Sequence, residues 1–127
     1  MSKRFLRKRY FFLILTLLLA IEIFWFSSLP GDATRGGNAW IPRIYHFTVF
    51  FLLNFFLLAS IKPGKRLRFK YVMLALILSV IYALSDEFHQ MFVPLRSANL
   101  PDVLTDTAGI LFSIVVSSIF VKKVKKK

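Results

Sequence analysis

The chain has 127 residues, of which 57% are hydrophobic and 17% aromatic. It carries 18 Lys and Arg against 6 Asp and Glu, for a formal net charge of +12. A water-soluble domain of this size could not bury so much apolar mass, so the composition excludes most soluble enzymes and favours a polytopic membrane protein. The absence of Cys also excludes disulfides and thiolate metal sites.

Four apolar stretches follow one another along the chain, each close to the ~20 residues that a helix needs to cross ~30 Å of hydrocarbon. We expect membrane-spanning helices at about 10–29, 41–61, 71–92 and 103–121. The connections are short and carry turn residues such as Pro30, Pro63 and Pro94, which leaves no room for a soluble domain. The sequence therefore predicts an all-α protein, a four-transmembrane-helix bundle, with residues 1–127 as a single membrane domain.

The basic residues are divided unevenly between the two ends of such a bundle. Fifteen of them lie before the first stretch, in the second connection or after the fourth stretch, and the opposite end holds only Arg35, Arg43 and Arg96. Short loops rich in Lys and Arg stay in the cytoplasm, so we expect both termini to be cytoplasmic. The same runs attract anionic membrane lipids. They lack aromatic stacking positions, so we expect no nucleic-acid partner.

Ionisable residues lie inside all four stretches, although such groups are costly in a membrane and should face the bundle interior or a wet cavity. The apolar run 71–84 covers only ~21 Å at ~1.5 Å per residue, so the polar residues after it must lie partly in the outer leaflet. The run 108–121 is equally short. Every helix therefore brings a titratable group to a similar level near its outer end: Glu22, His46, Asp86, Glu87, His89 and Asp106.

Helical geometry narrows which of these side chains can meet. At ~100° per residue, Asp86, Glu87 and Gln90 form one polar stripe, with His89 on its flank. In the fourth stretch, two acidic residues are followed by three small residues, all at spacings of three or four: Asp102, Asp106, Gly109, Ser113 and Ser117. Small residues permit close helix approach, so we expect these carboxylates at the outer mouth of a packing seam.

Each of these residues also has a structural interpretation. His46, Glu22 or Asn54 alone would be a hydrogen-bonded packing residue, and the serines of the seam can bond to their own helix backbone. As a set, however, the acidic groups exceed the cations near them, so mutual salt bridging does not explain them. Pro94 and Pro101 hold Arg96 near the mouth of the seam, where it can pair with a carboxylate or a ligand phosphate. We predict a functional site formed by six residues: Asp86, Glu87, His89, Gln90, Asp102 and Asp106.

Two runs carry a resemblance to a known family. The sequence DEFHQMFVPLR at 86–96 and DVLTDTAG at 102–109 contain the order E-x-x-Q followed by D-x-x-x-D-x-x-G. This order resembles the signature of the VanZ-like membrane protein family, and weaker similarities at 27–31 and at His46-Phe47 extend the match over nearly the whole chain. The sequence departs from the family pattern at Leu95 and Ser113, where Gly is common, and at Pro42-Arg43, where an Asp-Lys pair often precedes the histidine.

The resemblance implies a multi-pass protein of the bacterial plasma membrane, in a family whose namesake is associated with low-level resistance to the glycopeptide teicoplanin. It implies no mechanism. The predicted site faces the extracytoplasmic side, where lipid-linked wall precursors reside. We therefore predict a polar pocket that binds or remodels a cell-envelope amphiphile, which is a wall precursor, a lipid headgroup or a lipoglycopeptide antibiotic.

Three functions fit these residues. In a binding protein, the ligand contacts would come from Gln90, His46, Asp86, His89 and Arg96. In a hydrolase or transferase, Glu87, Asp102 and Asp106 would supply a protonated acid beside an ionised base. A divalent metal with a histidine ligand is a variant of this, but the spacing matches no metal motif, so we expect no cofactor.

The third function is a proton or cation path. It is disfavoured because titratable groups are missing from the inner leaflet. The sequence leaves the choice between binding and catalysis open, and we prefer binding for its smaller demands. The seam of small residues serves equally well within one chain or between subunits, so a homo-oligomer is compatible with the pattern.

Overall fold

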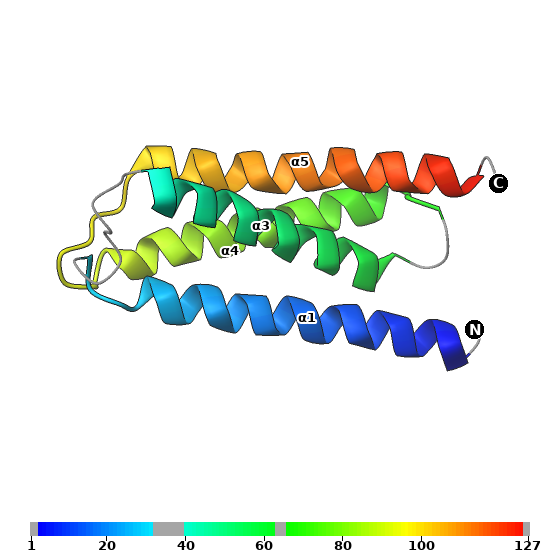
Figure 1. Cartoon of the computed structure of the whole chain (residues 1–127), viewed down its shortest axis with the longest axis horizontal. Coiled ribbons are helices and arrows are strands. Elements are labelled where there is room, and N and C mark those ends of the chain that lie inside the picture. The colour runs from blue at the N-terminus through cyan, green and yellow to red at the C-terminus, as the bar shows by residue number, and fades with distance from the viewer. Residues whose placement is uncertain (1–2, 32–39, 63–65, 126–127) are drawn as a thin grey trace.

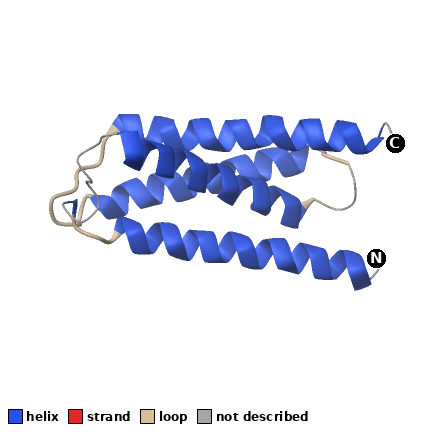
Figure 2. Cartoon of the chain, viewed as in Figure 1, coloured by secondary structure: helices blue, strands red, loops and turns tan. Residues whose placement is uncertain are grey.

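A computed structural model of the chain, which describes residues 3–31, 40–62 and 66–125, contains four long helices. They are α1 Lys3–Ser27, α3 Trp40–Ile61, α4 Phe69–Gln90 and α5 Leu100–Lys125. The helices lie lengthwise beside one another, with both termini at one end and the α4–α5 connection at the other (Figure 1). The described residues contain no strand (Figure 2). Each helix is long and apolar enough to cross a membrane, which confirms the predicted fold class.

The helix ends differ from the predicted spans for local reasons. α1 begins at Lys3 rather than near residue 10, and α5 continues to Lys125, because Lys and Arg are good helix formers and nothing there breaks the helix. α5 begins at Leu100, so Pro101 lies in its first turn, where the missing N–H has no partner to lose. α4 ends at Gln90, two positions before the predicted end, in a tight turn that precedes Pro94.

The core lies along the inner faces of the helices. Its largest members include Ile23, Phe50 and Ile110, which are at most 1% exposed. Large apolar side chains such as Trp25 and Ile81 are more than half exposed on the outward faces. A soluble protein would not present such faces to water, whereas lipid is a suitable solvent for them.

The predicted seam on α5 is buried and packs against α3. Asp106, Gly109, Ser113 and Ser117 all lie in the bundle interior. A Cβ at Gly109 would overlap the carbonyl oxygen of Phe47, so only glycine permits this distance between the two backbones. The seam therefore brings α5 into close contact with α3 within one chain.

Asn54 joins three helices in the middle of the bundle. Its Nδ2 donates to Oγ of Ser113 at 2.6 Å, and its Oδ1 accepts from Oγ of Ser79 at 3.0 Å. Ser113 also donates to the carbonyl of Ile110 in its own helix at 2.7 Å. These bonds satisfy the buried amide without charge, so Asn54 has the interhelical packing role expected for it.

Candidate functional site

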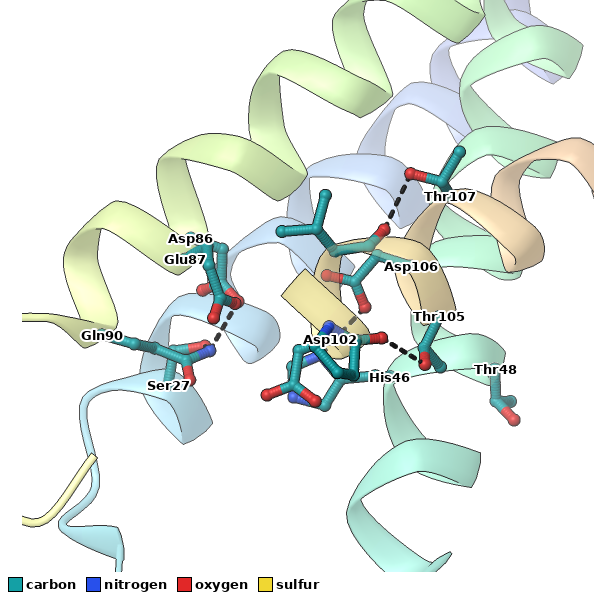
Figure 3. Close-up of polar contacts among 12 residues, drawn as sticks. Ser27, His46, Thr48, Asp86, Glu87, Gln90, Asp102, Thr105, Asp106 and Thr107 are labelled. Carbon is teal, nitrogen blue, oxygen red and sulfur yellow. Dashed lines mark hydrogen bonds and ion pairs between the residues drawn. The ribbon is translucent and has the colours of Figure 1, made fainter. Parts of the chain in front are cut away.

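His46 of α3 and Asp106 of α5 form a buried pair at the end of the bundle away from the termini (Figure 3). Nδ1 of His46 lies 2.9 Å from Oδ1 of Asp106. Asp106 is 0% exposed and His46 is 9% exposed. A carboxylate at Nδ1 fixes the orientation of an imidazole ring and directs its other nitrogen outward. Among the residues that the structure describes, Nε2 of His46 has no hydrogen-bond partner.

The local sequence explains how this pair forms. Gly109 comes three residues after Asp106 and lies on the same face of α5. Its contact with the backbone of Phe47, the residue after His46, brings the two helices together at this height. The ring of His46 also stacks on that of Phe50, with centroids 6.4 Å apart. The close approach at Gly109 therefore places Asp106 within reach of His46.

Glu87 of α4 is buried beside the α4–α5 connection. Its Oε1 accepts a hydrogen bond from the backbone N–H of Asn99 at 2.6 Å. Its Oε2 is buried and, like Oδ2 of Asp106, has no hydrogen-bond partner in the described part of the chain. Two carboxylates from different helices thus each have one bonded and one unbonded oxygen.

Asp86 and Gln90 of α4 are linked to Arg96 in the α4–α5 connection. Nε2 of Gln90 donates to Oδ2 of Asp86 at 2.9 Å, and Oε1 of Gln90 accepts from Nη1 of Arg96 at 3.2 Å. Ser27 Oγ lies 3.4 Å from the same Nε2 atom. Gln90 is therefore held on both sides, and it orients the carboxylate of Asp86.

Arg96 also fastens the connection to the C-terminal end of α1. Its Nε donates to the carbonyl of Leu29 at 2.9 Å, and its Nη2 donates to that of Phe26 at 3.0 Å. Carbonyls at a helix C-terminus lack partners within the helix and carry partial negative charge, so a guanidinium is well suited to them. Leu95, just before Arg96, has a φ of 62°. This is the position at which the related pattern commonly has Gly, and the positive φ explains that preference.

Asp102 and His89 lie at the margins of the cluster. Asp102 is partly exposed, in the first turn of α5. Oδ1 of Asn99 accepts from its backbone N–H at 3.0 Å and so caps this helix. His89 faces α1 instead, with Nε2 at 3.0 Å from Oγ of Ser28 and its ring 4.7 Å from that of Phe24.

Two hollows adjoin the His46–Asp106 pair. One is a cavity of about 90 Å³ beside the α4–α5 connection, lined by His46, Gln90, Arg96, Asn99 and Asp102 among others. The other is a groove of about 310 Å³ between α1 and α3, lined by Glu22, Phe26, Ile41, Tyr45, His46 and Arg96 among others. Pro42, His46 and Arg96 line both, so the polar cavity and the groove meet at these three residues.

The structure brings most of the predicted site residues to one end of the bundle: His46, Asp86, Glu87, Gln90, Arg96, Asp102 and Asp106. The charges of Asp86 and Asp102 act on both His46 and Asp106. His89 is not part of this group. Within residues 3–31, 40–62 and 66–125, no three His, Asp or Glu side chains are placed to hold a metal ion.

Two residues of the site were not predicted. Tyr45 lines the groove, and its hydroxyl lies 3.4 Å from Oε1 of Glu22. Asn99 bonds Glu87 and caps α5. An Asn one position before a Leu-Pro helix start is a recognisable capping signal, so Asn99 could have been found from the sequence. Nothing in the sequence distinguishes Tyr45 from the other aromatic residues of its helix.

Four helices long and apolar enough to cross a membrane indicate a multi-pass membrane protein, and its acidic and imidazole groups are buried together near one end of the bundle. The family model described as VanZ/LLP1 matches residues 11–121. The chain belongs to this family, as the motifs at 86–96 and 102–109 predicted. Comparisons with curated proteins and with solved structures gave no match.

Proposed function

We propose that this protein binds the polar headgroup of a cell-envelope amphiphile in the cavity beside His46, with the apolar part of the ligand in the α1–α3 groove. The observation that carries the proposal is the position of His46. Its Nδ1 is held by Asp106, and the ring lines both the polar cavity and the adjoining groove. A fixed polar group where a polar cavity meets an apolar groove suits a ligand that has both a polar headgroup and an apolar chain.

The walls of the groove support this assignment. Phe26 and Ile41 are about half exposed and border a hollow whose exposed surface is mostly apolar, although polar residues also line it: Glu22, Ser27, Tyr45, His46 and Arg96. Both side chains belong to outward-facing parts of α1 and α3, where a membrane protein meets lipid. An acyl or isoprenoid chain can therefore reach the groove from the bilayer without crossing water.

The charge distribution supports an extracytoplasmic position for this end of the bundle. Helix α1 begins and α5 ends at the opposite end (Figure 1), which carries 12 of the 14 basic residues that the structure describes. Basic segments are retained in the cytoplasm, so the cavity would face the outer leaflet of the plasma membrane. Wall precursors, lipid headgroups and lipoglycopeptide antibiotics are amphiphiles found on that side.

The binding proposal is tested by identifying what the protein carries. The full chain is purified from its native membrane under mild conditions, and co-purifying amphiphiles are identified by mass spectrometry. We expect one class to be enriched with the wild type and depleted with His46→Gln. The matched control is Thr48→Ala, because Thr48 lies two residues after His46 on an exposed face of α3 and its hydroxyl donates to the carbonyl of Ile44 in its own helix. Equal lipid profiles for the three proteins would refute the proposal.

The orientation is tested separately. The chain has no native Cys, so single-Cys variants report one position each. Ser97→Cys lies in the exposed α4–α5 connection, and Arg66→Cys lies just before α4 at the other end. An impermeant thiol reagent applied to intact cells should label residue 97 and leave residue 66 unlabelled. The reverse pattern would place the cavity on the cytoplasmic side.

A second function is favoured by one specific feature. An imidazole oriented by a buried carboxylate, with its second nitrogen facing a cavity, has the arrangement of a general base in hydrolysis or group transfer. In that case His46 would take a proton from an attacking hydroxyl or water, and Asp106 would stabilise the resulting imidazolium. Asp106→Asn should then reduce turnover of the co-purified amphiphile, measured at saturating ligand, by far more than it weakens its binding. If the wild type leaves that amphiphile chemically unchanged, the function is binding alone.

A further inference from the structure

Among the described residues, the polar end of the bundle has more acidic than basic side chains. All the described acidic residues of the chain are there: Glu22, Asp86, Glu87, Asp102 and Asp106. The guanidinium of Arg96 donates to the end of α1 and to Gln90. Arg43 lies over the ring of Trp40, 5.5 Å from its centroid, and borders a different groove between α3 and α5. The acidic cluster around the cavity therefore has a negative net charge when its carboxyl groups are ionised, although Arg96 lines the cavity as well as Asp102.

Two buried oxygens of this cluster have no hydrogen-bond partner among the described residues, so they can accept from a ligand. Glu87 is 6% exposed and Asp106 is 0% exposed, and the unbonded oxygens are Oε2 and Oδ2. Figure 3 shows the second oxygen of Asp106 turned toward the side of the cluster that holds Asp86 and Glu87. The charges of Glu87 and Asp106 also act on one another. Buried carboxylates in this state are unfavourable until a donor or a cation compensates them.

The cavity is separated from each of these two carboxylates by the residue that bonds it. Asn99, which bonds Glu87, and His46, which bonds Asp106, form part of its wall, and Asp102 lines it directly. At about 90 Å³ it holds the equivalent of about three waters at ~30 Å³ each. A compact group fits this space, where a positive charge would face Asp102 in the wall and lie one residue away from Glu87 and Asp106.

We propose that the headgroup bound in this cavity carries a primary ammonium group. This inference rests on the proposed binding function and specifies the chemical class of its ligand. An ammonium is compact and offers three donors, and its charge is opposite to that of the cluster. A phosphate would be repelled by the carboxylates, and a quaternary ammonium would supply charge without N–H donors.

The proposal is tested with four amphiphiles that share one chain length and differ in headgroup: decylammonium, decyltrimethylammonium, decyl phosphate and decyl glucoside. The full-length protein is reconstituted in phosphatidylcholine nanodiscs, and binding is measured by titration calorimetry against empty nanodiscs. We expect decylammonium to bind at least about tenfold more tightly than each of the others, since one charge-assisted hydrogen bond is worth that factor. This comparison uses only the wild type, so it does not depend on how a variant folds.

Variants locate the site. Glu87→Gln and Asp106→Asn keep the size of the side chain and remove its charge, and each should weaken decylammonium binding about tenfold. Ser85→Ala is the matched control, because Ser85 is exposed on the same helix and bonds the carbonyl of Tyr82 in that helix. Unchanged affinity in both acidic variants would overturn the proposal.

The outcomes separate the two levels of inference. If decyl phosphate or decyl glucoside binds as tightly as decylammonium, and His46→Gln weakens that binding, the cavity binds headgroups but the ammonium assignment is wrong. If no amphiphile binds above the level of empty nanodiscs, and the native-membrane preparation also carries none, the proposed function fails as well. Selective binding of decylammonium that depends on Glu87 and Asp106 supports both.

Discussion

Gly109 controls the distance between α3 and α5, and Gly109→Ala tests that dependence. A Cβ at this position would overlap the carbonyl oxygen of Phe47 and lie 3.2 Å from the backbone nitrogen of Phe51. The obstructing atoms belong to a helix backbone, so a side-chain rotation cannot relieve the overlap. Restoring ordinary van der Waals contact requires α5 to move away from α3 by about 1 Å.

The expected cost follows from two opposing effects. Alanine in place of glycine favours the helix by about 1 kcal/mol. Overpacking at a close helix contact costs about 1–3 kcal/mol, and more when backbone atoms must shift. We expect a net destabilisation of about 1–2 kcal/mol. The same shift would lengthen the His46–Asp106 bond from 2.9 Å to about 3.9 Å, which is beyond hydrogen-bond range.

The assay is unfolding in mixed micelles, in which the fraction of denaturing detergent is raised while helicity is followed. Leu111→Ala is the matched control, since Leu111 is half exposed on the lipid-facing side of α5. Amphiphile binding should be lost in Gly109→Ala and retained in Leu111→Ala. If Gly109→Ala is more stable than the wild type by the full helix-propensity gain and binds normally, the close approach of α3 and α5 does not position the site.

Three further changes follow from individual contacts. His46→Ala leaves the fully buried carboxylate of Asp106 without its partner. The free energy of unfolding in mixed micelles should therefore fall by about 3 kcal/mol. A decrease of less than about 1 kcal/mol would mean that the carboxyl of Asp106 is not ionised in the folded protein. Asn54→Ala should cost only about 1 kcal/mol by the same measurement and leave binding intact, because Asn54 joins helices away from the cavity. Leu95→Gly relieves the positive φ and should raise the free energy of unfolding by about 1 kcal/mol, whereas a decrease would show that the Leu95 side chain contributes more than the strain removes.

The sequence predicted the stripe on α4 and the seam on α5 because both depend on helical periodicity alone. Asp86, Glu87 and Gln90 share a buried face, and so do Asp106 and Gly109. The same reasoning put His89, at the flank of the stripe, in the predicted site. The tertiary structure places it against α1, since a residue at the edge of a helical face meets whichever neighbour the packing provides.

The sequence predicted that Arg96 lies near the acidic cluster, but it did not predict all of the hydrogen-bond partners of this residue. Two prolines flank its connection, so a position near the cluster followed from the sequence. Its bonds to the carbonyls of Phe26 and Leu29 did not, because a helix end offers carbonyl acceptors whatever its side chains are. Residue patterns therefore contain no signal for such a contact.

The amino-acid sequence by itself determined the four helices, the family and the gathering of acidic groups near one end. Apolar length, short motifs and a spacing of three or four residues are properties of a segment and need no knowledge of its neighbours. Only the tertiary structure decided that Asp106 bonds His46, that Asn99 bonds Glu87 and that the cavity and the groove meet at His46. Those outcomes depend on which helix faces meet and at what height, and backbone contact at Gly109 sets both for α3 and α5.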